Sequence, residues 1–375
     1  MSVNLDIQRI KSPAATEIYI TATPRENRLL ENQAQEIFSG IRDTLLAQKA
    51  HILQERIFGT QSAMEKVLRV RSQIYGDIDD GVAPSALCGK EGMCAPIAGV
   101  QVHAVISDTK PEVLILDENL CGRILRVLGR TYLTLSGIRA PQSTQEAGNA
   151  AEQAKVMMEK AESALKQFGA DFLSVPRTWM WLCDILGWYD DFNRVRNKFF
   201  TERGLIGKDS RQSMPASTGI GLCPAAGSEC AMDLTAVLGP ADSIQFLGAV
   251  GKQQCALEYG SAFSRASRCV TPAGETVFVS GTASIDADGI TTNVGDALGQ
   301  INTTIDNVRA VLRDMNAADE DVVHVVAYCK TIDVEKIFDE VKGDYPWPWV
   351  TVICDICRPD LLFEIEATAM PKQRA

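Results

Sequence analysis

The hydrophobic pattern along the C-terminal third of the chain predicts a hairpin followed by a helix. Residues 275–292, ETVFVSGTASIDADGITT, combine β-branched and aromatic side chains as strands do, with a bend at Ser280-Gly281. The pair Asp288-Gly289 is typical of a tight turn. From residue 294 to residue 315, apolar side chains recur every three or four positions and form one face of a helix. The pattern therefore predicts a helix that packs on a sheet.

The segments that follow complete a β-β-α-β-α-β-β unit. Residues 322–332 form a short, unbroken apolar run with many β-branched residues, which predicts a buried strand. A second helix is expected at 334–341, and two last strands at 350–357 and 361–369. One sheet with two helices accounts for the whole region.

The same order of elements occurs a second time, 147 positions earlier. The helix stripe recurs at residues 154–168, SVPRTWMWLCDI (174–185) falls where the other copy has its buried strand, and LTLSGI (133–138) matches VFVSGT. Because stripe, strand and bend recur in one order, the sequence predicts a duplicated unit. We expect an α/β (α+β) protein of two units, each a mixed β-sheet backed by helices, with domains at 1–205 and 206–375.

The rest of the chain has weaker patterns. In the first 125 residues, the apolar spacing predicts a helix at 32–54 and a strand at 96–106. Residues 205–232 are rich in glycine, serine and proline, and we expect them to form a loop at the rim of a pocket.

Charge narrows the class of function. The chain has a formal net charge of -11 at pH 7 and a sequence pI near 4.9, which argues against nucleic acid and anionic membrane surfaces, because binding to either needs basic patches. No apolar run approaches the roughly 20 residues that cross a bilayer. We therefore expect neither nucleic acid nor membrane as a partner. An anionic substrate would have to be bound by local arginines.

The cysteines and histidines do not suggest a metal centre. The eleven cysteines are an odd number, and no secretory leader precedes them, so we expect a cytoplasmic protein in a reducing environment. Only Cys354 and Cys357 have CxxC spacing, and the three histidines are far apart, so we expect no metal site. The motifs of serine hydrolases and of nucleotide-binding loops do not occur.

Two glutamates in the last strand are the first candidates for chemistry. Glu364 and Glu366 alternate with apolar residues, so both lie on one face of the strand. This face could simply be the solvated side of an edge strand. If instead it were partly buried, the pKa of a carboxyl group would rise and leave a general acid at neutral pH.

Arginine and aromatic residues supply the remaining candidates. Arg177, Arg265 and Arg358 stand outside charge runs and could each bind a carboxylate in bidentate geometry. The segment 177–193 holds three of the five tryptophans together with Tyr189. Core packing explains most such clusters, but this one would also suit the wall of a pocket for a small unsaturated ring.

These segments resemble two related families. VFVSGTASID, the helix stripe and RPDLLFEIEATAM are similar to the RidA/YjgF family, whose small α/β subunits form trimers with clefts between them. The long segment starting RTWMWLCDILGWYDDF, together with PASTGIG (215–221), EYGSAFSRA (258–266) and CRPDLLFEIE (357–366), resembles the chorismatases. The resemblance implies a degenerate RidA/YjgF-like domain at 1–205 and a second one, carrying the catalytic glutamate, at 206–375.

The resemblance to chorismatases implies an activity and roles for residues. Such enzymes release pyruvate from chorismate, a small dicarboxylate, without a metal or organic cofactor. By motif position, Glu364 would protonate the enolpyruvyl ether, and Cys357, seven residues earlier, would favour 3-hydroxybenzoate as the second product. Arg177, Tyr189, Tyr259 and Arg265 would line the pocket and hold the substrate.

Alternatives to this activity stay open. The chain could hydrolyse chorismate to a dihydroxycyclohexadiene carboxylate, bind a small aromatic or carboxylate ligand without turnover, or act as a scaffold. An apolar cleft without arginine would favour the scaffold. The segment PWPWVTVICDIC lacks the arginine that RidA-type imine deaminases place there, which disfavours imine hydrolysis. We expect a monomer or a small homo-oligomer.

Overall fold

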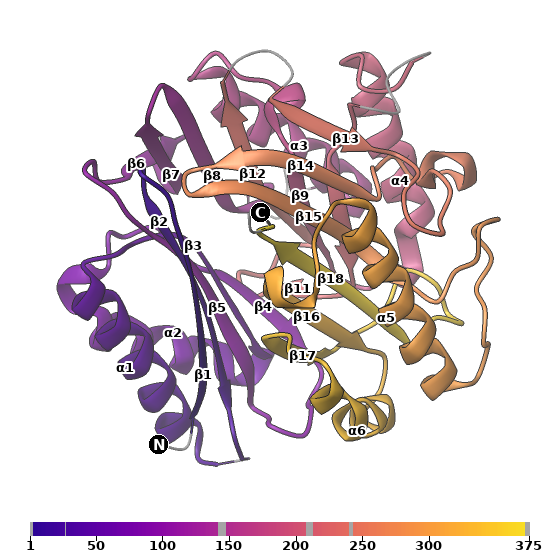
Figure 1. Cartoon of the computed structure of the whole chain (residues 1–375), viewed down its shortest axis with the longest axis horizontal. Helices are drawn as coiled ribbons and strands as arrows, with labels where there is room; N and C mark the ends of the chain where they lie inside the picture. The colour runs from indigo at the N-terminus through magenta and orange to yellow at the C-terminus, as the bar shows by residue number, and fades with distance from the viewer. Residues whose placement is uncertain (1–2, 27, 142–147, 208–212, 240–242, 372–375) are drawn as a thin grey trace.

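The described residues form three six-stranded sheets, which are packed with helices (Figure 1). This computed structural model describes residues 3–26, 28–141, 148–207, 213–239 and 243–371. We name the parts built around the three sheets the N-terminal, middle and C-terminal units. None of the helices in these ranges is long and apolar enough to cross a membrane.

The N-terminal unit contains two helices and the first five strands. Its sheet has the order β1-β2-β5-β3-β4-β11, so a two-residue strand from later in the chain forms one edge. The elements are β1 (Val3–Lys11), β2 (Thr16–Pro24), α1 (Leu30–Gln48), β3 (His51–Thr60), α2 (Gln61–Tyr75), β4 (Ser85–Gly89), β5 (Ile97–Ile106) and β11 (Cys223–Pro224).

The middle unit repeats this arrangement with a sheet of order β10-β9-β12-β8-β7-β6. A capping box between Asn149 and Glu152 fixes the start of its first helix. The elements are β6 (Glu112–Leu116), β7 (Asn119–Val127), β8 (Arg130–Ile138), α3 (Ala150–Lys166), β9 (Arg177–Leu182), α4 (Ile185–Glu202), β10 (Ala216–Ile220) and β12 (Cys230–Leu238).

The C-terminal unit has the sheet order β13-β14-β15-β18-β16-β17. The Asp296 side chain caps its first helix, which buries the apolar stripe expected from the sequence. The elements are β13 (Ile244–Leu247), β14 (Ala266–Thr271), β15 (Gly274–Ala283), α5 (Ala297–Asp314), β16 (Val322–Cys329), α6 (Ile332–Val341), β17 (Trp349–Ile353) and β18 (Phe363–Ala369).

The helices and strands predicted after residue 294, and the helix and strands of the earlier copy, are confirmed, but the described residues form three such sheets and not two. The hairpin predicted at 275–292 was wrong, because β15 pairs with the preceding strand β14 and the turn at Asp288-Gly289 is flanked only by an isolated bridge between Ile285 and Thr291. The N-terminal copy could not be predicted, because its sequence no longer matches the sequences of the other two units, although its strands pair in the same order. The boundary predicted at residues 205 and 206 falls inside the middle unit, whose sheet takes β9 from one side of it and β10 and β12 from the other. How many independently folding domains these units form stays a prediction.

Two other local predictions were wrong. The helix expected at 32–54 ends at Gln48, because Lys49 adopts a left-handed conformation and β3 begins at His51. Residues 205–232, expected to form a loop, contain β10, β11 and the start of β12. The small residues of β10 allow a close approach between units, since the Ser217 backbone nitrogen donates to Ser280 Oγ at 2.8 Å.

The three units are arranged around a pseudo-threefold axis. In each, the strands after the first helix face the hairpin strands of the next unit: β3 faces β7 and β8, β10 faces β14 and β15, and β16 and β17 face β2 and β5. The aromatic residues Phe58, Trp181 and Tyr328, one from each unit, share a single apolar cluster. Three clefts result, which we number first (N-terminal and middle units), second (middle and C-terminal units) and third (C-terminal and N-terminal units).

Buried ion pairs connect neighbouring units close to this axis. Arg56 of β3 donates to Asp233 of β12 at 2.9 Å, and both side chains are almost completely buried. Ser85 Oγ and the Gly137 backbone nitrogen satisfy the other oxygen of Asp233 at 2.6 and 2.8 Å. The Trp179 ring lies 3.6 Å from the guanidinium carbon of Arg56, so the cation also gains a cation–π contact.

One pair of cysteines departs from the expectation of a fully reduced protein. Cys183, after β9, and Cys223, in β11, form a disulfide with their Cα atoms 4.6 Å apart. The other nine cysteines are free thiols. This pair could not be predicted, because the two residues are 40 positions apart and meet only when β11 joins the N-terminal sheet.

The Arg56–Asp233 pair provides a test of the contact between the N-terminal and middle units. Asp233→Ala would leave the guanidinium buried without its ionic partner, so we expect a loss of about 3–5 kcal/mol in the free energy of unfolding, measured by urea denaturation. The exposed pair Arg42–Asp43, at 2.7 Å, is the control, and Asp43→Ala should cost less than about 1 kcal/mol. Equal losses in both variants would contradict this role of Asp233.

Candidate active site

The second cleft encloses a cavity of about 40 Å³ between the middle and C-terminal units. Helix α4 and strand β10 contribute one wall, and strands β15 and β18 with the loop after β17 contribute the other. The cavity is lined by Tyr189, Arg196, Ser217, Gly219, Tyr259, Ser261, Phe263, Arg265, Gly281, Ala283, Ile285, Cys357, Arg358 and Glu364. It has room for a few water molecules, so a larger ligand would require some of these side chains to move.

Glu364 lies on β18, which is an interior strand of the C-terminal sheet and pairs with both β15 and β16. Glu364 and Glu366 share one face, as the alternation predicted, and they are only 4% and 3% exposed. The alternative interpretation, a solvated face of an edge strand, is therefore wrong. The physical reason is that the middle unit covers this face of the sheet.

The surroundings of Glu364 favour its neutral form. Burial and, to a smaller extent, the nearby Glu366 raise its pKa to about 8, against the opposing effect of Arg177, Arg265 and Arg358. A Cβ atom on Gly281 would lie 2.2 Å from Glu364 Oε1, so glycine at this position lets the carboxyl group fit against β15. The site therefore holds a carboxylic acid that is still largely protonated at pH 7.

Glu366 makes contacts of a different kind, although it shares the strand face with Glu364. Its Oε2 accepts a hydrogen bond from Arg177 Nη2 at 2.8 Å, and its Oε1 accepts one from Trp179 Nε1 at 3.0 Å. Arg177 also donates to Thr218 Oγ1 at 2.6 Å. Glu366 is thus held as a buried ion pair beside the protonated Glu364, and the two carboxyl groups are differentiated by their partners.

Three guanidinium groups surround the cavity: Arg196 from α4, Arg265 before β14, and Arg358 from the loop after β17. In the described part of the chain, none of the three forms an ion pair with a carboxylate. Arg265 donates to the Tyr259 hydroxyl and to the Gln254 carbonyl, and Arg358 donates to the Gly289 carbonyl at 2.7 Å. The cavity therefore has positive charge available for an anionic ligand.

Cys357 is a thiol in this environment. Burial and, to a smaller extent, the neighbouring Glu364 raise its pKa to about 12. A thiol with this pKa is not ionised at neutral pH, so it is not an activated nucleophile. What Cys357 can contribute is its shape and a weak S–H donor.

Five of the six predicted site residues line one cavity, and one does not. Glu364, Cys357, Tyr189, Tyr259 and Arg265 come together there. Arg177 is fully buried next to the cavity and is engaged by Glu366 and Thr218, so it is not among the lining residues. Its Nε and Nη1 atoms have no hydrogen-bond partner in the described structure.

Sequence reasoning missed Arg196 and the small residues Ser217 and Gly219. Arg196 follows Tyr189 by seven positions, which is two helical turns, so the two side chains share one face of α4. That spacing was a usable signal. The segment 205–232 was expected at the rim of a pocket, but as a loop, and only the docking of the C-terminal unit brings Ser217 and Gly219 of strand β10 to the cavity wall.

Only one of the three clefts carries a carboxyl group at this strand position. The residue paired with Tyr328 is Glu364, whereas the equivalent partner of Trp181 is Ala231 and that of Phe58 is Gly99. The three aromatic residues belong to the same cluster around the axis, which fixes the equivalence. The repeated fold therefore supplies three clefts, and the sequence supplies this acid to the second cleft alone.

Sequence comparison places the C-terminal unit in a known family. The family model described as endoribonuclease L-PSP matches residues 257–371. A RutC family protein from Pyrococcus abyssi (strain GE5 / Orsay) is 30% identical over 100 residues, which are 26% of this chain and 79% of that protein. The chain therefore belongs to the RutC family.

Structure comparison extends the likeness to most of the chain. The crystal structure of a chorismatase, solved at 1.08 Å resolution, matches with a TM-score of 0.60 at 20% identity, covering 85% of this chain and 93% of that chain. At this identity the likeness is one of fold. The fold that the sequence resemblance implied is confirmed.

The raised pKa of Glu364 predicts how stability depends on pH. Between about pH 4.5 and pH 8 the folded protein keeps the proton on Glu364, whereas the unfolded chain releases it. The free energy of unfolding therefore falls as pH rises through this window. Glu364→Gln removes the ionisation. The variant should gain stability relative to wild type, on the order of a few kcal/mol, between pH 5 and about pH 9.

Chemical denaturation at a series of pH values measures this difference. The exposed Glu340, replaced in Glu340→Gln, shows the effect of the same chemical change at the surface. A stability difference between Glu364→Gln and wild type that stays constant over the whole range would contradict a raised pKa at Glu364.

Proposed function

We propose that the protein is a chorismatase, which converts chorismate into pyruvate and 3-hydroxybenzoate. The observation that carries the proposal is the buried carboxyl group of Glu364, with its pKa raised to about 8, in a cavity lined by three arginines that form no ion pair with any carboxylate of the described residues. An acid-labile enol ether that bears carboxylates needs both features. The fold likeness to a chorismatase raises the expectation but does not identify the substrate.

Substrate binding would use the unpaired arginines. Chorismate has one carboxylate on its ring and one on its enolpyruvyl group, and Arg196, Arg265 and Arg358 offer more than one cation for them. Because the empty cavity is small, we propose that the Arg265 and Tyr259 side chains separate when the ring enters, exchanging their mutual hydrogen bond for contacts with substrate. Tyr189 and Phe263 would form apolar walls for the ring.

Proton transfer from Glu364 would start the reaction. The acid donates its proton to the methylene carbon of the enolpyruvyl ether, and the electron pair of the C=C bond forms the new C–H bond. This leaves an oxocarbenium ion, whose positive charge lies next to the carboxylate that Glu364 has become. A pKa of about 8 suits the role, because the group is protonated at neutral pH and still acidic enough to donate.

Arg177 would act through Glu366 and Glu364 in this scheme. It fixes the Glu366 carboxylate, and the charge of Glu366 helps to keep the proton on Glu364. Its two unpartnered nitrogen atoms lie buried beside the site. We propose Arg177 as a positioning residue, in place of the direct substrate contact expected from the sequence.

Cys357 would influence which nucleophile traps the cation. If the ring hydroxyl attacks, the later steps can give pyruvate and 3-hydroxybenzoate with no net consumption of water. If water attacks, the products are pyruvate and a dihydroxycyclohexadiene carboxylate. A protonated, partly buried Cys357 thiol beside Glu364 occupies space that a water molecule could use, which favours attack by the ring hydroxyl.

The remaining alternatives are a binding protein without turnover and a scaffold. An apolar cleft without arginine would favour the scaffold, but three arginines line this cavity, which disfavours that role. A protein that only binds its ligand would not need a general acid, so the buried, protonated Glu364 favours catalysis. We further propose a cytoplasmic enzyme that is a monomer or small homo-oligomer and whose acid-catalysed reaction needs no metal or organic cofactor.

Loss of the acid at position 364 is the central test of this activity. Glu364→Gln keeps the shape but cannot donate the proton, so pyruvate release from chorismate should fall by about 100-fold or more. Wild-type activity should decline above about pH 8, when Glu364 loses its proton. Lactate dehydrogenase coupling measures the pyruvate, and the surface variant Glu340→Gln should match wild type.

Absence of pyruvate release by wild type would overturn the assignment of this activity. In that case calorimetry with chorismate would distinguish a binding protein from one that does not recognise chorismate. Full activity of Glu364→Gln would instead keep the activity and overturn the role of Glu364.

Product analysis tests the role of Cys357. Cys357→Ala should retain pyruvate release within about tenfold, because the acid remains, but should shift the second product from 3-hydroxybenzoate toward the diol as water gains access. Chromatography of the products measures the ratio. Cys121→Ala, a buried cysteine on β7 outside the cavity, is the matched control. An unchanged ratio in Cys357→Ala would remove the reason for choosing 3-hydroxybenzoate.

A further inference from the structure

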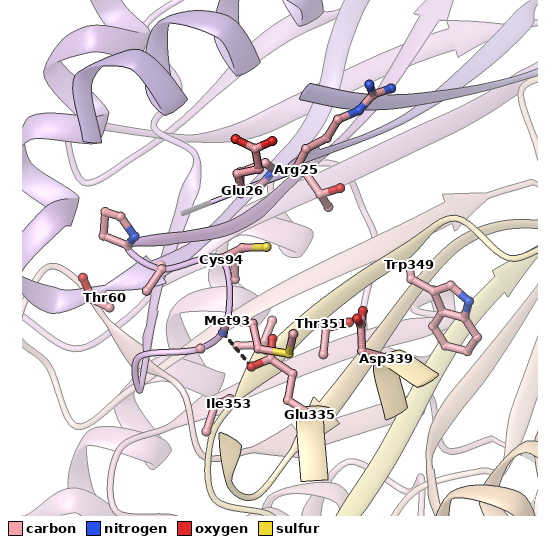
Figure 2. Close-up of a pocket in the computed structure, with 18 of the residues that line it drawn as sticks. Arg25, Glu26, Thr60, Met93, Cys94, Glu335, Asp339, Trp349, Thr351 and Ile353 are labelled. Carbon is pink, nitrogen blue, oxygen red and sulfur yellow. Dashed lines mark hydrogen bonds between the residues drawn. The ribbon is translucent and has the colours of Figure 1, made fainter. Parts of the chain in front are cut away.

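The third cleft contains a larger cavity than the second, of about 330 Å³ (Figure 2). It lies between the C-terminal and N-terminal units and is built from equivalent elements: α6 and β17 on one side, and β2 with the loop between β4 and β5 on the other. Figure 2 shows Glu335 below Met93 of that loop, joined to it by a hydrogen bond, and Asp339 of the same helix α6 to the right of Met93. A volume of this size accommodates a small organic molecule.

The chemistry proposed for the second cleft is not possible in this one. Gly99 takes the strand position that Glu364 has in the second cleft. A Cβ atom on Gly99 would lie 3.0 Å from Val350 and 3.1 Å from Thr23, so a larger side chain would not fit without movement. The third cleft is therefore a candidate for binding without the same acid catalysis.

Glu335 is the charged group that distinguishes this cavity. It is 8% exposed and accepts a hydrogen bond from the Met93 backbone nitrogen at 2.8 Å. No lysine, arginine or histidine in the described part of the chain forms an ion pair with it. Gly92 packs directly against the carboxylate, since a Cβ atom there would lie 2.9 Å from Glu335 Oε2. The glycine lets the loop close over the acid.

The other charged residues around the cavity already have partners. Lys90 pairs with Asp355 at 2.9 Å, Lys342 pairs with Asp339, and Glu26 pairs with Arg28. Arg25 donates to Asn4 Oδ1 at 2.7 Å, and its guanidinium group points away from Glu335 in Figure 2. Among the described residues, the buried charged group of this cavity that forms no ion pair is thus negative, whereas in the second cleft the groups without an ion pair are arginines.

We propose that the third cleft binds a small organic cation, a primary ammonium compound, through Glu335. The ammonium group would donate to the carboxylate, which gains the counterion it lacks, and an ion pair in this partly enclosed position is worth more than one at the surface. The apolar part of the ligand would lie against Met93 and Trp349, which also line the cavity. This site is independent of the activity proposed for the second cleft.

The probes for this site are β-phenylethylammonium and 3-phenylpropanoate, which are similar in shape and opposite in charge. The test titrates each into the full-length protein and follows heat by calorimetry and the Met93 amide by NMR, because that amide contacts Glu335. We expect the ammonium ion to bind with a dissociation constant of about 1 mM or below, and to shift the Met93 resonance. The carboxylate should not shift it.

Variants at the acid complete the test. Glu335→Gln keeps the size of the side chain and should weaken binding of the ammonium ion about tenfold or more. Glu335→Asp, which retains the charge, should keep part of the affinity. Glu340→Gln, on the exposed face of the same helix, should bind as wild type does. No binding to wild type at about 10 mM, equal binding to Glu335→Gln, or an equal response to 3-phenylpropanoate would overturn the proposal.

Discussion

The candidate active site depends on the buried ion pair between Arg177 and Glu366. It joins β9 of the middle unit to β18 of the C-terminal unit, and it lies on the same strand face as Glu364. Taking both charges out of water is costly unless their hydrogen bonds are made, and Thr218 and Trp179 supply part of these bonds. With one carboxyl group fixed as an ion, its neighbour is stabilised as an acid.

The three units show how one fold can be used for different purposes in one chain. Each unit presents equivalent strands to a cleft, and equivalent aromatic residues meet at the axis. Glutamate, alanine and glycine at the equivalent strand position give the clefts different chemistry. The first cleft is crossed by ion pairs between Arg123 and Asp80 and between Arg56 and Asp233, so it serves mainly to hold the units together.

Charge pairing separates the other two clefts. In the second cleft, three guanidinium groups form no ion pair with a carboxylate of the described residues and an acid holds its proton, which suits an anionic, acid-labile substrate. In the third cleft, no cation in the described part of the chain forms an ion pair with the carboxylate of Glu335. Both conditions are unfavourable for stability in the empty protein, because unpaired charges are desolvated by the surrounding units. Such groups are informative about ligands since folding alone gives no reason to place them there.

The sequence by itself determined the helices and the later strands of the C-terminal unit, the counterparts α3, β8 and β9 in the middle unit, and the shared face of Glu364 and Glu366, because periodicity reports which side chains point the same way. Its motifs also predicted that Tyr189, Tyr259, Arg265 and Cys357 belong to the site. Only the tertiary structure decided that β18 is an interior strand, that Arg177 is engaged by Glu366, that Arg196 enters the cavity and that a third sheet exists. The reason is that burial and charge pairing depend on what packs against a face, and in this protein that partner comes from another unit.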